Sequence, residues 1–156
     1  MGGIMRLTEN ERNVLRQEIF DKVVTHLRNQ KYKSKQPKSV CSLTNFGALR
    51  GLRNRKSAVG ILIADEKYEK PMEFLTLYDL AKEYPNRVPT YFSDFLMREF
   101  LWEINELHSL LLDTANKRQK WKKNFERKVL YLSWKYVLKI PKKVENPLDK
   151  TTTEEA

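Results

Sequence analysis

The sequence predicts a mainly α-helical protein, a compact bundle of about five helices. Three long stretches carry apolar residues at intervals of three and four, the period of an amphipathic helix. The 17 aromatic residues (seven Phe, seven Tyr, three Trp) require a buried core. A chain of 156 residues fits one domain. We expect residues 1–143 to form a single basic helical domain and residues 144–156 to be a disordered tail.

The first predicted helix covers residues 9–29. Thr8 stands at the N-cap and Glu11 three positions later, which is the spacing of a capping box. Apolar residues then recur every fourth position, at Leu15, Ile19, Val23 and Leu27. This spacing places them in one stripe that faces a core.

The segment after this helix is predicted as loop and short elements. Residues 30–39 are polar, basic and interrupted by Pro37, so they indicate a loop. Residues 40–43 alternate in polarity, as in a short strand. Residues 57–63 have two interpretations: a short buried helix capped by Ser57, or a central strand that would make a small β-hairpin near residues 40–63. We favour the helix.

Three further helices are expected in the second half. One covers residues 75–84, beginning at Thr76 and ending before Pro85. A long one opens at Thr90 or Ser93 and runs to about residue 114, with a stripe of Phe92, Leu96, Phe100, Ile104, Leu107 and Leu111. The last ends at Pro141, with a stripe of Trp121, Phe125, Val129, Leu132 and Tyr136. The helices at residues 9–29 and 90–114 have the cleanest stripes, and we expect them to form the core pair.

Cysteine content and hydropathy exclude several classes of protein. Cys41 is the single cysteine, which rules out an intramolecular disulfide and a cysteine-based zinc cluster. No run of apolar residues approaches the 18 that a transmembrane helix needs. We therefore expect a cytoplasmic protein that does not associate with membranes.

Charge is strongly segregated along the chain, whose net charge is +10. Residues 22–64 contain ten basic residues and no acidic one. Residues 65–113 contain eleven acids against five bases, and residues 114–143 contain eleven bases and one acid, Glu126. Two basic blocks therefore flank an acidic middle.

The basic blocks hold the candidate binding residues. In the second block, seven bases lie within twelve positions, and in the first a glycine-punctuated loop carries four. The candidates are Lys117, Arg118, Lys120, Lys122, Lys123, Arg127, Lys128, Arg50, Arg53, Arg55 and Lys56. Clustered cations of this kind attract nucleic-acid phosphate. Two plainer interpretations stay open: an ordinary solvated helix face, and neutralisation by the acidic block of the same molecule.

No enzyme motif is present. The sequence lacks the phosphate-binding GxxxxGK and the patterns GxGxxG, HExxH and GxSxG. His26 and His108 are too few for a three-histidine metal site and fit half-buried structural positions better. Cys41 has no flanking residues that indicate a reactive thiol. We expect no catalytic activity, no metal and no cofactor. The alternative is a metal-dependent nuclease whose carboxylates would come from the acidic block.

Part of the sequence resembles a family of short uncharacterised bacterial and phage proteins with the pattern THL…C…GLKCAVGxLIxDExY. The matching residues are Thr25-His26-Leu27, Gln30, Cys41, Gly51-Leu52, Ala58 to Ile63, Asp65-Glu66, Tyr68, and later Ile104 to His108 and Trp121. The second cysteine of that pattern is Ser57 here, its later proline is Ala64, and the aspartate of its HD pair is Ser109. Chemistry that needs two cysteines therefore does not carry over. The resemblance implies a phage or mobile-element accessory protein.

Two functions follow as hypotheses. The first is binding to nucleic acid, or to a nucleic-acid-containing machine, through the clustered lysines and arginines. The second is a protein-directed inhibitor or modulator of a host enzyme such as a defence nuclease or polymerase. In that case the partner would be an acidic host protein or ribonucleoprotein.

Overall fold

The computed structural model describes residues 6–35, 48–112 and 120–143. In these ranges the chain is helical, and the β-type pairing is limited to an isolated parallel bridge between Tyr32 and Leu112. The α-helices of the described chain are α1 (Glu9–Gln30), α2 (Ala58–Ile61), α3 (Leu77–Glu83), α4 (Phe95–Ser109) and α5 (Lys122–Tyr136). Four 3₁₀ turns lie between them: η1 (Leu52–Asn54), η2 (Asp65–Lys67), η3 (Lys70–Phe74) and η4 (Thr90–Ser93). The predicted mainly helical class is confirmed.

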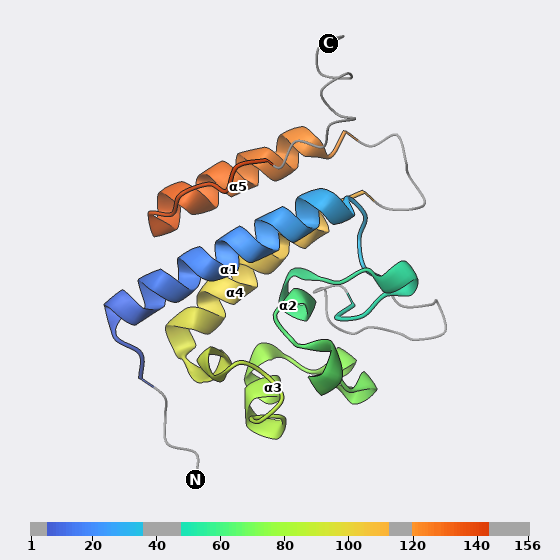
Figure 1. Ribbon diagram of the computed structural model, residues 1–156, viewed down its shortest axis with the longest axis vertical. Coiled ribbons are helices and arrows are strands. Elements are labelled where there is room, and N and C mark those ends of the chain that lie inside the picture. Colours follow the sequence, from blue (N-terminus) through green and yellow to red (C-terminus); the bar gives the residue numbers. More distant parts are fainter. Residues whose placement is uncertain (1–5, 36–47, 113–119, 144–156) are drawn as a thin grey trace.

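The three long helices form one side of the molecule, and the short elements pack on the other (Figure 1). α1 and α4 run in the same direction and pack on each other, as the sequence predicts, while α5 runs in the opposite direction and packs on α4. The C-terminal ends of α1 and α4 therefore lie at the same end of the molecule as the start of α5.

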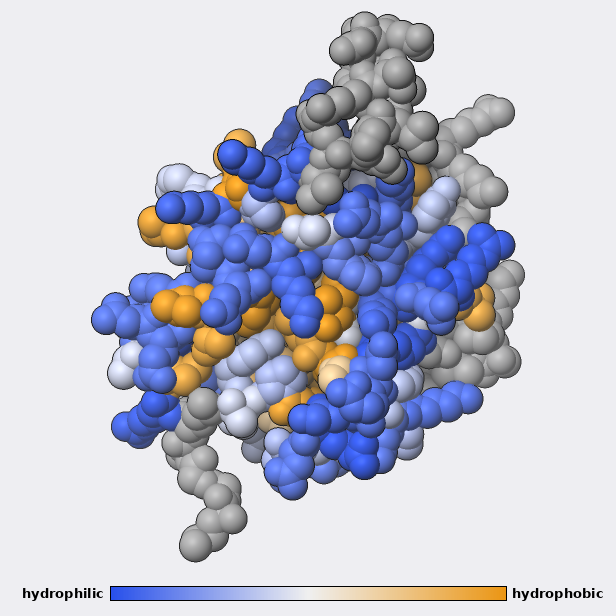
Figure 2. All heavy atoms as spheres, in the orientation of Figure 1, coloured by the Kyte–Doolittle hydropathy of each residue, from blue (hydrophilic) through white to orange (hydrophobic). Residues whose placement is uncertain are grey.

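The core lies between these helices. The fully buried side chains from the three long helices include Phe20, Val23, Val24, Leu27, Met97, Phe100, Leu101, Ile104, Leu107, Phe125, Val129 and Leu132. Figure 2 shows hydrophilic side chains over most of one face, with hydrophobic ones in a band across its middle.

The predicted helix starts are confirmed for α1 and α3. Thr8 Oγ1 accepts the Glu11 N–H at 3.1 Å, and Glu11 Oε1 accepts the Thr8 N–H at 3.0 Å, which is a complete capping box. Thr76 caps α3 by accepting the Asp79 N–H at 3.1 Å.

The start of α4 differs from the prediction. Thr90 and Ser93 belong to η4, and Asp94 caps α4 by accepting the Met97 N–H at 3.0 Å. Asp94 takes this role because Arg12 of α1 also donates two hydrogen bonds to it, at 3.0 and 3.2 Å. With α4 turned this way about its axis, Met97 is buried and Leu96 is 38% exposed. The prediction that Leu96 belongs to the buried stripe is therefore wrong.

α5 confirms the predicted stripe but ends early. Trp121, Phe125, Val129 and Leu132 are buried and Tyr136 is half-buried. The helix ends at Val137, whose φ of 54° is left-handed, rather than at Pro141. The chain then turns back along the helices: Lys139 N donates to Gln17 Oε1 at 2.9 Å, and Pro141 O accepts from Arg28 at 2.7 Å.

Of the two interpretations of residues 57–63, helix or strand, the structure shows the helix. Ser57 Oγ accepts the Gly60 N–H at 3.0 Å and caps α2, so no hairpin strand forms in this segment. A side chain at Gly60 has no room, because a Cβ there would lie 2.3 Å from Leu49 O. The strand predicted at residues 40–43, Cys41 and the predicted tail all lie outside the described residues.

Candidate nucleic-acid interface

Three elements from distant parts of the sequence converge at the end of the molecule where α1 and α4 finish and α5 begins. Arg28, in the last turn of α1, donates to both carboxylate oxygens of Glu126 in α5, at 2.9 and 2.8 Å. Lys33 N donates to Leu112 O at 2.8 Å, which ties the chain after α1 to the chain after α4. The loop around η1 joins them, since Leu52 N donates to Lys35 O at 3.1 Å.

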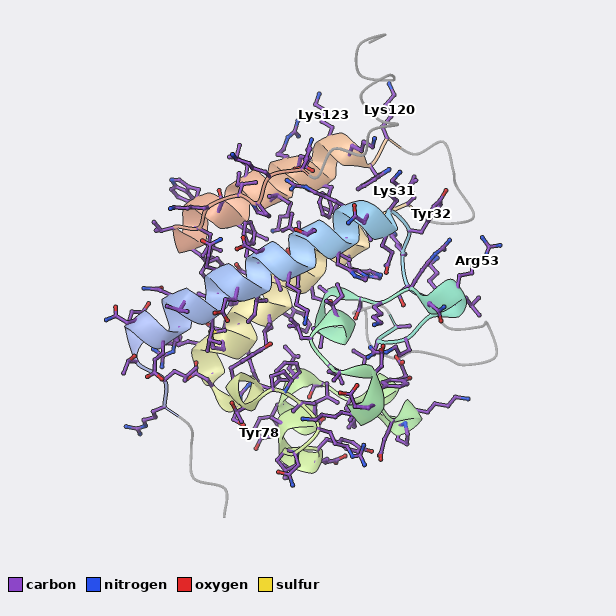
Figure 3. All side chains as sticks on the ribbon, in the orientation of Figure 1. Lys31, Tyr32, Arg53, Tyr78, Lys120 and Lys123 are labelled. Atoms are coloured by element: carbon purple, nitrogen blue, oxygen red, sulfur yellow. The ribbon has the colours of Figure 1, made fainter. Side chains whose placement is uncertain are left out.

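The start of α5 presents unneutralised cations at this end. Glu126 is the one acid of residues 114–143, and Arg28 and Lys143 engage it, at 2.8 and 3.9 Å. Four exposed bases of α5 and its N-terminal flank have no carboxylate of the described chain within 4.0 Å: Lys120, Lys122, Lys123 and Arg127. Figure 3 shows Lys120 and Lys123 projecting away from the helix bundle.

The η1 loop adds an exposed arginine in a constrained backbone. Arg53 and Asn54 have φ of 58° and 59°, and Lys31, at the C-cap of α1, has φ of 65°. Side-chain-bearing residues rarely adopt this left-handed conformation, and surrounding contacts must hold them there. One such contact is the hydrogen bond from Gly51 N to Arg55 O, at 2.8 Å. Arg53 and Lys31 lie along the same end of the molecule as Lys120 (Figure 3).

Arg55 lies over an aromatic ring. Its guanidinium carbon is 4.4 Å from the centre of the Tyr32 ring. A guanidinium stacked on a ring keeps its N–H groups free to point sideways toward a phosphate. Gln30 fixes this arrangement, because its amide donates to Tyr32 O at 2.9 Å and to Lys56 O at 2.8 Å, while its oxygen accepts the Lys56 N–H at 2.8 Å.

The structure therefore brings bases from both predicted basic blocks to one end. We call this group the basic end: Lys31, Arg53, Arg55, Lys120, Lys122, Lys123 and Arg127. Lys31 comes from the basic loop predicted at residues 30–39 and joins the predicted candidates at this end. Lys117 and Arg118 lie outside the described residues.

Three other predicted residues have partners inside the molecule. Arg50 donates to Gly60 O at 2.7 Å and to Ile63 O at 2.6 Å, and forms an ion pair with Asp65 at 2.9 Å. Lys56 pairs with the same carboxylate at 3.0 Å, and Lys128 pairs with Glu106 of α4 at 2.8 Å. These bases hold the loop and the α4–α5 contact together, so we leave them out of the basic end.

Two buried polar residues that the sequence did not mark as site residues support the loops. The Glu73 carboxylate, 6% exposed, accepts the N–H groups of Leu49 and Arg50 at 2.8 and 2.9 Å. His108 Nε2 accepts the Ser34 N–H at 2.6 Å. Burial, with a smaller contribution from the charge of Lys33, lowers the pKa of His108 to about 4. His108 is therefore neutral and acts as a hydrogen-bond acceptor. The prediction that it is half-buried is wrong, since it is 3% exposed.

The described residues contain no group of three His, Cys, Asp or Glu side chains that could hold a metal ion. A search of the same residues also finds no helix with the length and apolar character needed to cross a bilayer. No protein family, curated protein or solved structure matches this chain.

A cleft with a different character lies between α3, α4 and α5. It measures about 690 Å³ and is lined by four aromatic rings and by charges of both signs. The rings belong to Tyr78, Phe95, Trp102 and Tyr136. Arg98 lies over two of them, at 5.4 Å from the centre of Tyr78 and 6.0 Å from that of Phe95. In Figure 3 Tyr78 lies at the opposite side of the molecule from Lys120.

Proposed function

We propose that this protein binds nucleic acid through the basic end. The observation that carries the proposal is that seven cationic side chains from three separate elements gather at one end of the molecule. No ion pair within the described chain neutralises them. A polyanion neutralised by such a cluster releases its counterions, and this release supplies sequence-independent affinity.

The basic end also has arginine side chains placed in a way that suits phosphate binding. The Arg55 guanidinium lies over the Tyr32 ring, and Arg53 is exposed on a loop that Arg50, Lys56 and Gln30 brace. Because Arg55 already contacts this ring before a ligand arrives, less of its side-chain entropy is lost on binding. Together with the resemblance to phage and bacterial proteins, this supports a cytoplasmic phage or mobile-element accessory protein.

A comparison of two double variants tests the proposal. Lys123→Gln/Arg127→Gln removes two charges from the basic end. Lys70→Gln/Lys82→Gln removes two exposed charges from the acidic middle of the chain. We expect the first to weaken binding to a generic oligonucleotide on the order of tenfold at ~0.1 M salt, and the second to leave affinity nearly unchanged. Equal affinities for both variants, or no binding by the wild-type protein, would rule the proposal out.

The aromatic cleft supports a second candidate function, a protein-directed modulator of a host enzyme. Tyr78, Phe95 and Trp102 are each more than half exposed, and exposed aromatic clusters of this kind are enriched in protein interfaces. A pull-down from nuclease-treated host lysate separates the two candidates. A partner retained after nuclease treatment, and lost on Trp102→Ala, would favour the second.

A further inference from the structure

The exposed face of α5 changes character along its length. Its first half carries the bases of the basic end, and its second half carries large exposed apolar and aromatic side chains. Those side chains are Leu130, Tyr131, Trp134 and Val137. Trp134 is 77% exposed, more than any other aromatic side chain in the described part of the chain. The core of the molecule gives no reason for a tryptophan at this position.

The bases and the rings lie on the same side of the helix. Positions 123, 127, 131 and 134 of α5 are separated by three or four residues, so they lie along one side of the helix. At 1.5 Å per residue this row is ~17 Å long. A nucleic-acid strand whose phosphates contact Lys123 and Arg127 can therefore extend along α5 as far as Tyr131 and Trp134.

The rings of Tyr131 and Trp134 differ in how much of their surface other side chains contact. Lys128 Nζ lies 4.8 Å from the centre of the Tyr131 ring and so occupies one face of that ring. Tyr131 in turn lies 6.5 Å from Trp134, with the ring planes 36° apart. Tyr131 thus borders Trp134 on one side, and the indole presents the larger exposed surface.

The charge around the other exposed aromatic residues is mixed. The exposed side of α4 carries Glu99 and Glu106 next to Phe95 and Trp102, and Glu103 lies in the same cleft, bonded to Lys135. Arg98 is the cation over Tyr78 and Phe95 there. On α5, in contrast, the exposed rings continue a row of exposed bases that have no carboxylate partner in the described chain.

We infer that the basic end continues along α5 into a base-stacking site at Trp134 and Tyr131, and that the protein prefers single-stranded nucleic acid. This inference rests on the proposed function and names its ligand class. Cations that hold the backbone and rings that stack on bases are the two components of single-strand binding. A duplex offers phosphates to the same lysines, but its bases are already stacked on one another and leave Trp134 without a partner.

The test measures the affinity of the full chain for an oligo(dT) strand and for a duplex of equal length. Base stacking on one aromatic ring contributes roughly 1–3 kcal/mol, which corresponds to a loss of about 5- to 150-fold in single-strand affinity for Trp134→Ala. Duplex affinity should not change. Trp134→Phe should retain most of the single-strand affinity, because it keeps a stacking ring. Trp102→Ala, the matched exposed tryptophan on the acidic helix, should bind like the wild type.

The outcomes separate this inference from the proposed function. If Lys123→Gln/Arg127→Gln weakens binding while Trp134→Ala binds both ligands like the wild type, the basic end stands and the stacking site is refuted. If Trp134→Ala weakens binding to phosphatidylserine vesicles and not to oligo(dT), Trp134 serves an anionic membrane surface and the inference is wrong. If neither ligand binds at all, the proposed function fails first.

Discussion

His108 connects the loop after α1 to the core through one hydrogen bond. Its Nε2 accepts the Ser34 N–H, and Ser34 Oγ donates to Ala48 O and Arg55 O at 2.7 and 2.9 Å. This chain of bonds leads from a buried helix position to Arg55 in the basic end. Ser34 is fully buried, and a Cβ at Gly51 would lie 2.4 Å from its hydroxyl. Gly51 and His108 thus both have structural roles in this loop.

His108 gives the protein a pH-dependent stability. Its pKa is lowered from 6.5 to about 4 in the folded chain, so the unfolded chain binds a proton that the folded chain does not. The unfolding free energy should therefore rise with pH between about 4 and 6.5, by up to about 3 kcal/mol. Chemical denaturation at several pH values measures this. His108→Gln keeps an acceptor oxygen without titrating, and a wild-type pH dependence in that variant would contradict the assignment.

At the scale of elements, helix ends were harder to predict than helix cores. The stripe of α5 and the capping box of α1 follow from local spacing and are confirmed. The start of α4 does not: Asp94 caps it, and the partner of Asp94, Arg12, lies 82 positions earlier in the chain. After Val137 ends α5, the returning chain bonds to Gln17 and Arg28 of α1. Local sequence carries no record of such partners.

Asp94 should be the most sensitive helix cap in the protein. Burial opposes its ionisation, but hydrogen bonds from Arg12 and from the Met97 N–H outweigh burial and lower its pKa. Its contribution to stability is therefore present at neutral pH and is lost as the pH falls through that lowered value. Asp94→Ala should lower the unfolding free energy by at least about 1 kcal/mol, the usual cost of a lost N-cap, and by more because Arg12 loses its carboxylate.

Thermal unfolding at neutral pH checks this prediction. Glu9→Ala is the comparison variant, since Glu9 is the exposed partner of the same arginine, with a side chain 64% exposed, and it also pairs with Arg16 at 3.3 Å. An exposed pair contributes little. Equal melting temperatures for Asp94→Ala and Glu9→Ala would show that the cap does not position α4.

At the scale of the whole molecule, the arrangement of charge was only partly predictable. The segregation of charge along the sequence predicted both basic blocks. The antiparallel course of α5 then brings bases of the second block close to bases of the first. Which bases are neutralised depends on contacts across 9 to 32 positions: Lys56 and Arg50 with Asp65, Lys128 with Glu106 and Lys135 with Glu103. Such pairs depend on how helices pack, and composition does not reveal them.

The salt dependence of binding tests the basic end most directly. For a single strand the logarithm of the affinity should fall with the logarithm of salt concentration at a slope of about −0.7 per neutralised phosphate, or roughly −5 for the seven cations. Lys123→Gln/Arg127→Gln should bring the slope closer to zero by about 1.4. Trp134→Ala should lower the affinity and leave the slope unchanged. A wild-type slope near zero, or one that the double variant leaves unchanged, would contradict the account.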